Sequence, residues 1–333
     1  MERPKRRPRY PGKNPRHFSE KYKELAPDRY ADDVEKVLAR GRTPAGTHRP
    51  IMVREILDAL APQPGELALD CTIGYGGHAM ELLRALQPGG RLIGLDVDAI
   101  ELPKTEARLR ALGFGPEVLT LHCCNYAGLA KILTERADVI LADLGLSSMQ
   151  MDNPARGFTY KFDGPLDLRM NPQRAQPASA LLSKLNASQI ANLLTENADE
   201  PHADRLAHAI ANATVSTTTD LATIIRTAGG NEDSIRRVFQ ALRIAVNDEF
   251  GALETLLRNL PFCLKAGGRV AILTFHSGED RRVKKAFQLG ERTGVYSEIC
   301  REVVRPDPEE IRANPRSRSA KLRWAHRSTA DVG

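Results

Sequence analysis

Short apolar runs alternate with stretches of helical apolar spacing along most of the chain. Five of these runs have the length of a buried strand, and glycine or proline lies near several of their ends. Strands separated by helices are typical of a parallel sheet covered by helices. The pattern therefore predicts an α/β fold with a doubly wound sheet, whose strands cover residues 67–70, 91–95, 118–122, 137–142 and 269–276.

Two helices outside the strand–helix alternation complete the sheet domain. One precedes the first strand and places Ile56, Leu57 and Leu60 on a single face. The other is a long helix over residues 234–260, and it leads into the fifth strand. Ordered structure is therefore expected from about residue 48 onward.

The segment between the fourth strand and that long helix follows a different pattern. Residues 178–227 are helical throughout, with Asp220 as the predicted N-cap of the last helix. A turn-rich polar stretch precedes them, and such long loops are usually functional or disordered. We therefore predict a helical insertion over 153–233, which interrupts a sheet domain made of 48–152 and 234–327.

The composition is that of a globular protein. Apolar residues make up 41% of the 333 residues and charged residues 27%. No apolar run approaches the roughly 18 residues that cross a bilayer. The five cysteines have no C-x-x-C spacing, which supports neither a disulfide framework nor a zinc site. Free thiols, a cytoplasmic location and no metal are expected.

Most of the net charge of +6 lies near the N-terminus. Residues 1–23 carry nine Lys or Arg against two Glu, a net +7, so the rest of the chain is close to neutral. A second basic cluster, Arg312 to Arg327, contains no acidic residue. We interpret 1–47 as a basic, disordered extension and 328–333 as a tail. Two basic clusters favour a polyanionic partner, RNA first, and solvated surface is the alternative.

A glycine turn between the first two strands is the strongest candidate for a binding site. Gly74, Gly76 and Gly77 follow the first strand, where a tight turn lets the backbone approach a ligand, and Asp96 ends the second. Parallel strands bring these residues to one edge of the sheet, where ligands of doubly wound folds bind. A carboxylate there can accept both hydroxyls of a ribose. The spacing also satisfies G-x-G-x-x-G/A, so a nicotinamide-dependent oxidoreductase is an alternative.

The ends of the other strands place further side chains at this edge. Tyr126 follows the third strand and offers a ring for stacking on a nucleobase, with packing as the alternative. Asp143 follows the fourth strand, and His276 ends the fifth. The histidine either faces a substrate or caps its strand.

Eight motifs along the chain occur in the order found in one known family. They resemble the bacterial ribosomal RNA small subunit methyltransferase H family, also called MraW, and the likeness covers about residues 47–327. The motifs are His48-Arg49-Pro50, Gly74-Tyr75-Gly76-Gly77-His78, Asp143-Leu144-Gly145-Leu146-Ser147-Ser148, Arg156-Gly157-Phe158, and the segments 163–170, 239–247, 275–281 and 314–323.

This resemblance implies a class I, Rossmann-like fold that binds S-adenosylmethionine and carries an inserted helical substrate domain. It implies N4-methylation of a cytidine in the decoding centre of 16S ribosomal RNA. The partner is then ribosomal RNA in the small subunit rather than a membrane, and a homodimer is left open. Carried over position by position, the cofactor contacts are Gly76, Gly77, His78, Asp96, Tyr126, Asp143 and Gln150.

Several positions depart from the family pattern. Met149 stands where the family commonly has Pro, and Gly278 where Leu is usual. The region 299–311 is short, and the family's Tyr-Gly-Glu-Glu-Arg stretch corresponds only loosely to 197–202. These departures concern the substrate side, so they bear on the target and leave the cofactor site as expected.

The implied reaction depends mainly on positioning, because methyl transfer from a sulfonium needs little acid–base chemistry. Asp143 is the first candidate to accept the N–H of the cytosine amine and to stabilise the positive charge that develops. Its alternative role is to bind the methionine ammonium. His276 is the second catalytic candidate. A non-catalytic RNA-binding assembly factor that keeps the fold is a further alternative function.

Residue type also suggests substrate contacts. Four arginines are candidates for phosphate contacts, with ordinary surface as the alternative: Arg156, Arg169, Arg316 and Arg318. Three aromatic side chains are candidates for stacking on an exposed base, with core packing as the alternative: Phe158, Tyr160 and Phe162.

Overall fold

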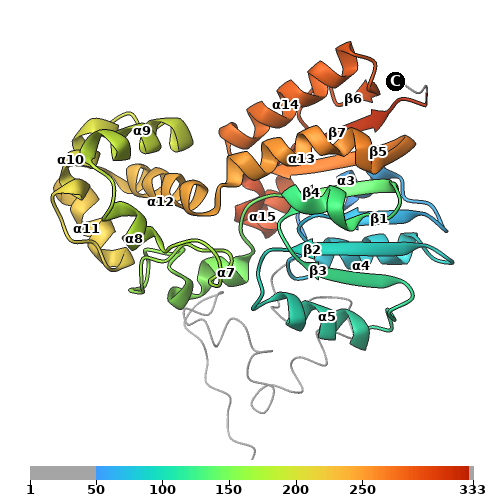
Figure 1. The fold of residues 1–333 in the computed structure, drawn as a ribbon, viewed down its shortest axis with the longest axis horizontal. Coiled ribbons are helices and arrows are strands. Elements are labelled where there is room, and N and C mark those ends of the chain that lie inside the picture. The colour runs from blue at the N-terminus through green and yellow to red at the C-terminus, as the bar shows by residue number, and fades with distance from the viewer. Residues whose placement is uncertain (1–49, 330–333) are drawn as a thin grey trace, which may run out of the picture. The chain divides into compact units, whose positions relative to one another are not determined.

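The computed structural model describes residues 50–329, whose fold is shown in Figure 1. The predicted extension over 1–47 lies outside the described residues, and so do residues 330–333 of the predicted tail. The fold below is that of residues 50–329.

A seven-stranded sheet has the strand order β3-β2-β1-β4-β5-β7-β6. The first five strands are parallel to one another. They correspond to the five predicted strands and confirm the α/β, Rossmann-like fold. The predicted end of the fifth strand is wrong, because β5 ends at Thr274 and His276 is the N-cap of the helix that follows. The bounds are β1 Leu67–Asp70, β2 Arg91–Asp96, β3 Leu119–Cys123, β4 Ala137–Asp143, β5 Leu264–Thr274, β6 Tyr296–Ile299 and β7 Lys321–Arg327.

Two strands, β6 and β7, are absent from the prediction. β7 is antiparallel to both β5 and β6, and it lies inside the stretch that we interpreted as a basic cluster. Leu322 and Ala325 are buried in this strand, whereas Arg323 is buried because it pairs with Asp280 at 2.6 Å between Nε and Oδ1. The strand was not predicted because its charged residues interrupt the apolar pattern. An arginine predicts a surface position unless the acidic partner that allows its burial is known.

Helices cover both faces of the sheet. Alternate residues of each strand point to opposite faces, so their side chains pack into two separate cores. On one face, Ala68 and Leu141 pack with side chains from α3 (Val53–Leu60), α4 (Gly77–Ala85) and α5 (Leu102–Ala111). On the other face, strand residues pack with α13 (Glu249–Cys263), α14 (Ser277–Arg292) and α6 (Leu129–Ile132). The predicted helix before β1 is α3, with Ile56 and Leu60 buried. Short helices include α7 (Ser148–Asp152) and α15 (Pro308–Ala313).

A separate bundle of helices follows β4 and is drawn in yellow-green to orange in Figure 1. Its core contains side chains from Phe158 to Val246. We call this bundle, including the loop before α8, the insert. Its helices are α8 (Ala178–Leu182), α9 (Ala187–Ala198), α10 (Ala203–Ala211), α11 (Thr218–Thr227) and α12 (Glu232–Asn247). The helical pattern predicted over 178–227 is thus confirmed.

The N-cap predicted for α11 is wrong by three residues. Thr217 is the N-cap, and its side chain accepts the N–H of Asp220. The Asp220 carboxylate accepts the N–H of Thr217 in return, at 2.9 Å. Both residue types are good N-caps, but only this reciprocal pair satisfies two free N–H groups of the first turn.

The long helix predicted over 234–260 is also wrong, because the structure has two helices here. α12 ends at Asn247, Asp248 adopts a left-handed conformation with φ 49° and ψ 45°, and α13 begins at Glu249. The apolar pattern continues through the break. The side chains of α12 pack into the insert, whereas those of α13 pack against the sheet. The change of packing partner explains the break, and sequence spacing does not contain it.

We predict that Thr217→Ala lowers the free energy of unfolding by about 1 kcal/mol, because the Asp220 N–H loses its acceptor in the first turn of α11. Urea unfolding measures this loss. Thr214→Ala is the matched control, since Thr214 is exposed and lies outside the helix. Equal losses in the two variants would contradict a capping role for Thr217.

Candidate cofactor and active site

Three carboxyl groups meet where the strand order reverses. Asp70, Asp96 and Asp143 are the last residues of β1, β2 and β4, and β1 lies between the other two strands. The chain continues from β1 to one side of the sheet and from β4 to the other, so a crevice is expected between these strand ends. The structure therefore brings Asp96 and Asp143, which the sequence predicted at the ends of separate strands, together with Asp70.

The glycine turn between β1 and α4 follows Asp70 at the same edge of the sheet. Gly76 is the N-cap of α4, with φ 81°, a conformation that favours glycine. Gly77 begins the helix, and a Cβ there would lie 2.4 Å from Cγ of Pro50. The turn thus requires glycine at one position for its backbone and at the next for close packing.

Asp96 is held in a fixed orientation by two backbone donors. Its Oδ2 accepts the N–H of Gly74 at 2.8 Å, and its Oδ1 accepts the N–H of Asp98 at 2.8 Å. Burial raises the pKa of Asp96 to about 6. The side chain keeps partial exposure, so its remaining lone pairs can accept hydroxyl groups of a ligand.

His78 and Asp143 face each other across the site. The His78 Nε2 lies 2.9 Å from the carbonyl oxygen of Ile51, which can only accept, so Nε2 carries the hydrogen. Nδ1 is then left with its lone pair and lies 3.5 Å from Oδ2 of Asp143. Burial lowers the pKa of His78, which keeps the ring neutral. Two acceptors face each other in this pair, and a proton between them would satisfy both.

Asp143 and Asp70 are strongly affected by burial. Burial raises the pKa of Asp143 to about 7, and the negative charge of Glu279 acts in the same direction. Burial also raises the pKa of Asp70 to about 7, against the N–H of Thr72, which the carboxylate accepts at 3.0 Å. A cation bound beside these buried carboxyl groups would stabilise their ionised form.

Tyr126 and His276 lie on the α13 side of the sheet. Tyr126 begins a short 3₁₀ turn, and its half-buried ring packs against the core shared with α13. Burial raises the pKa of its hydroxyl, so the phenol stays neutral. His276 precedes α14, with Nε2 3.2 Å from Oε1 of Glu279, while Oε2 of that glutamate accepts the N–H of Phe275 at 2.9 Å. The packing predicted as an alternative for Tyr126 thus exists, and the residue as a whole is only partly buried.

The sequence is similar to those of known proteins. The sequence matches the MraW methylase family over residues 45–328. The chain belongs to this family. A relative from Alkaliphilus metalliredigens, named ribosomal RNA small subunit methyltransferase H 2, is 50% identical over 341 residues, which cover 97% of this chain and 98% of the relative. Another relative, from Lachnoclostridium phytofermentans, is named ribosomal RNA small subunit methyltransferase H 1. It is 48% identical over 338 residues, which cover 96% of this chain and 92% of the relative.

Membership of the MraW methylase family confirms the family predicted from the motifs and S-adenosylmethionine as the cofactor. The residues present fit this group. It carries a sulfonium and an ammonium, and the carboxyl groups of Asp70, Asp96 and Asp143, which end neighbouring strands, can pair with positive charge in their ionised form. The family decides against the nicotinamide-dependent oxidoreductase that the glycine motif alone allowed.

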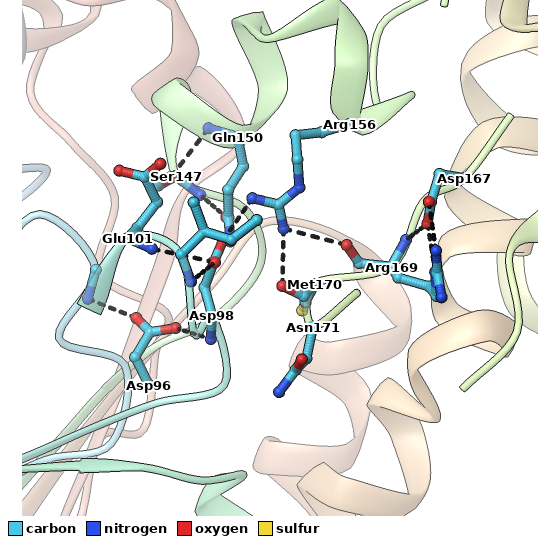
Figure 2. Close-up of polar contacts among 12 residues, drawn as sticks. Asp96, Asp98, Glu101, Ser147, Gln150, Arg156, Asp167, Arg169, Met170 and Asn171 are labelled. Atoms are coloured by element: carbon cyan, nitrogen blue, oxygen red, sulfur yellow. Dashed lines mark hydrogen bonds and ion pairs between the residues drawn. The ribbon is translucent and has the colours of Figure 1, made fainter. Parts of the chain in front are cut away.

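Gln150 of this MraW-family chain is buried, and its amide is already engaged. The side-chain Nε2 donates to Oδ2 of Asp98 at 2.7 Å, and Oε1 accepts the N–H of Ser147 at 3.0 Å. Arg156 joins the same group (Figure 2). The sequence pattern did not single out Asp98, although it lies only two residues beyond Asp96. Glu279 was missed in the same way, three residues after His276.

The arginines predicted as phosphate contacts differ in their surroundings. Arg156 is buried, with 7% of its surface exposed, so it does not lie on the surface that an RNA backbone would contact. Arg169 pairs with Asp167 at 2.7 Å, and Arg316 pairs with Asp152 at 2.6 Å. Arg318 is exposed. The prediction for Arg156 is therefore corrected, because a carboxylate and backbone carbonyls enclose its guanidinium.

The aromatic candidates of the MraW-family insert also separate by burial. Phe158 is buried in the core of the insert. The ring of Tyr160 packs against Phe239, with 5.4 Å between the centroids. Phe162 is 46% exposed. Packing thus accounts for the first two side chains, and Phe162 is available for a partner.

Within residues 50–329, no group of His, Cys, Asp or Glu is arranged to hold a metal ion, and no helix there is both long and apolar enough to cross a bilayer. All five cysteines are free, as expected from their spacing.

We predict that Asp70→Asn stabilises the cofactor-free protein more at pH 8 than at pH 5, by about 2 kcal/mol. The folded-state pKa of Asp70 is raised from 3.8 to about 7, so the native state holds the proton more tightly. The stability that this group contributes is complete below pH 4 and is lost as pH rises to 7. Asparagine resembles the protonated form and avoids this loss.

Urea unfolding of both proteins at the two pH values tests the prediction. The asparagine oxygen can still accept the Thr72 N–H, so the local turn is preserved in the variant. The same gain at pH 5 and pH 8 would show that the effect is not the titration of Asp70.

Proposed function

We propose that the protein is a cytoplasmic S-adenosylmethionine-dependent RNA methyltransferase whose target is the exocyclic N4 of a cytidine in the decoding centre of 16S ribosomal RNA. The names of its relatives support ribosomal RNA of the small subunit as the substrate. The motif resemblance supports the N4 position of cytidine. The contacts of Asp143 supply the chemical argument.

The pair of Asp143 and His78 is the observation that carries the proposal. The exocyclic amine of cytosine is a weak nucleophile because its lone pair is conjugated with the ring. As the amine forms its bond to carbon, positive charge develops on N4 and one N–H becomes acidic. Asp143, with its pKa near 7, is able to accept that proton at neutral pH. The Nδ1 lone pair of His78, 3.5 Å from Oδ2, can stabilise the proton on the carboxyl group.

The residues that would hold the cofactor follow the strand ends. S-adenosylmethionine, when bound, supplies the electrophilic methyl group. We propose that the Asp96 carboxylate accepts its ribose hydroxyls, that Tyr126 lies beside its adenine, and that the glycine turn at Gly76 and Gly77 lets the backbone approach it. His78 borders the same turn. Gln150 acts through the Asp98 carboxylate that it orients, since both ends of its amide are engaged.

His276 is proposed as a positioning residue of this site. It pairs with Glu279, whose negative charge raises the pKa of Asp143. The pKa of Glu279 is lowered despite its burial, because His276 lies beside it and the charge of Arg243, which pairs with Glu249 at 2.8 Å, acts in the same direction. His276 therefore bears on the proton affinity of Asp143 through Glu279.

The insertion over 153–233 is proposed to receive the RNA, with the sheet parts 48–152 and 234–327 holding the cofactor. Helix α12 extends the receiving part, because its side chains share the core of the insert. Phe162 is the aromatic side chain of this loop that is exposed. A ring at the surface can stack on an unpaired base whatever its identity.

We predict that Asp143→Asn lowers the rate of methyl transfer at least about 100-fold, because an amide cannot accept the amine proton. The measurement uses labelled S-adenosylmethionine and small ribosomal subunits that lack this methyl group, followed by nucleoside mass spectrometry. Labelled N4-methylcytidine formed by the unmodified protein supports both the reaction and the target.

A different labelled nucleoside would overturn the target but keep the reaction. Cofactor binding without any transfer to subunits would overturn the catalytic function and favour the assembly-factor alternative. Loss of cofactor binding in Asp143→Asn, measured by calorimetry, would assign Asp143 to the methionine ammonium instead of the amine.

We predict that Phe162→Ala raises the KM for ribosomal subunits about tenfold and leaves the affinity for S-adenosylmethionine unchanged, because one stacking contact is lost. Phe262→Ala is the matched control, since Phe262 is 71% exposed but belongs to α13 on the sheet. A similar KM for the two variants would remove Phe162 from the RNA-binding surface.

A further inference from the structure

Asp98 lies at the centre of a buried polar cluster beyond the end of β2. Its side chain is 1% exposed. Oδ2 accepts Nη1 of Arg156 at 2.8 Å and Nε2 of Gln150 at 2.7 Å (Figure 2). Oδ1 accepts the backbone N–H of Ile100 at 2.9 Å and of Glu101 at 3.2 Å. Four donors surround this carboxylate, so its burial is compensated only while all of its partners stay in place.

The cluster is connected directly to the cofactor side of the crevice. The N–H of Asp98 donates to Oδ1 of Asp96, the carboxylate proposed for the ribose. The two aspartates are separated by one residue, so a shift of Asp98 moves the donor that orients Asp96. The position of Asp98 therefore bears on how Asp96 is presented to a ligand.

Arg156 connects the cluster to the loop of the insert. Its Nη2 donates to the carbonyl oxygen of Met170 at 2.8 Å and to that of Arg169 at 3.2 Å. Figure 2 shows the guanidinium between Asp98 on one side and this loop on the other. A planar guanidinium can donate in several directions at once, which a lysine ammonium on a flexible stem does less well.

Asn247 holds the same loop from its other side. Its Oδ1 accepts the N–H of Met170 at 2.8 Å, and its Nδ2 donates to the carbonyl oxygen of Leu168 at 2.8 Å. Leu168 has φ 62°, a left-handed conformation that is costly for a branched side chain and persists only when its surroundings enforce it. The loop is thus fixed by Arg156 from the cofactor side and by Asn247 from the insert.

Both chain connections of the insert pass through this group of contacts. The first is the segment after β4, which contains Arg156 and the loop at Met170. The second is the break between α12 and α13, which follows Asn247 directly. Contacts at both connections determine how the insert is oriented against the strand ends.

We propose that Arg156 is a positioning residue that couples occupation of the cofactor site to the orientation of the insert, so that cofactor and RNA strengthen each other's binding. The inference rests on the proposed function. A ligand held by Asp96 restrains the turn that carries Asp98, and Asp98 restrains Arg156 and the loop. The first ligand to bind then bears the loss of conformational entropy, so the second ligand binds more tightly, and the effect is the same in either order.

The test measures the affinity for small ribosomal subunits that lack the methyl group, with and without saturating S-adenosylhomocysteine. We expect the unmodified protein to bind subunits about tenfold more tightly when that ligand is present. In Arg156→Met this ratio falls to near one. Arg156→Lys is the second variant if the first does not fold, and we expect it to lower the ratio, because one ammonium cannot reach Asp98 and the Met170 carbonyl together.

Arg237→Met is the matched control. Arg237 also pairs with a buried carboxylate, Nε to Oε2 of Glu200 at 2.6 Å, but both residues belong to the insert. This variant loses stability and keeps the tenfold ratio. A purely structural role of Arg156 would leave its ratio unchanged as well.

The outcomes are separable from those of the proposed function. A ratio of one in the unmodified protein, or a wild-type ratio in the folded Arg156 variants, overturns the coupling while methyl transfer stands. An unmodified protein that neither binds nor methylates subunits overturns the proposed function and the coupling with it.

Discussion

The site depends on one constraint: several carboxyl groups lie together at the edge of the sheet where the strand order reverses. Adjacent parallel strands must end at one edge, so Asp70, Asp96 and Asp143 are close together whatever their individual roles. Burial opposes their ionisation, as the raised pKa values show. The protein offsets this cost for Asp70 and Asp96 through the backbone N–H groups of Thr72, Gly74 and Asp98.

The imidazole of His78 shows how a second constraint acts within the first. A backbone carbonyl fixes the hydrogen on Nε2, which directs an unprotonated nitrogen at Asp143. The arrangement is unfavourable for two bare acceptors and becomes favourable when a proton lies between them. Burial and the charge of Glu279 raise the pKa of Asp143 to about 7, and the His78 lone pair lies where it can accept the proton that this carboxyl group then holds.

The insert depends on contacts that the sheet provides. Its own core is apolar and helical, but its orientation relies on Asp98, Arg156 and Asn247, which connect buried groups at both of its chain connections. Such polar contacts contribute little net stability compared with apolar burial, yet each is costly to leave unpaired. These polar contacts select one orientation of the insert relative to the sheet and add little to the free energy of unfolding.

The sequence by itself determined the features that local pattern and residue type encode. The five parallel strands, the glycine turn and the aspartates at the strand ends follow from apolar runs and from the residues next to them. Only the tertiary structure decided β7, the break at Asp248 and the burial of Arg156. Each depends on a partner distant in sequence, such as Asp280 for Arg323 or Asp98, 58 residues before Arg156. A charged residue in a sequence predicts a surface position. Only the folded structure shows where an opposite charge allows that residue to be buried.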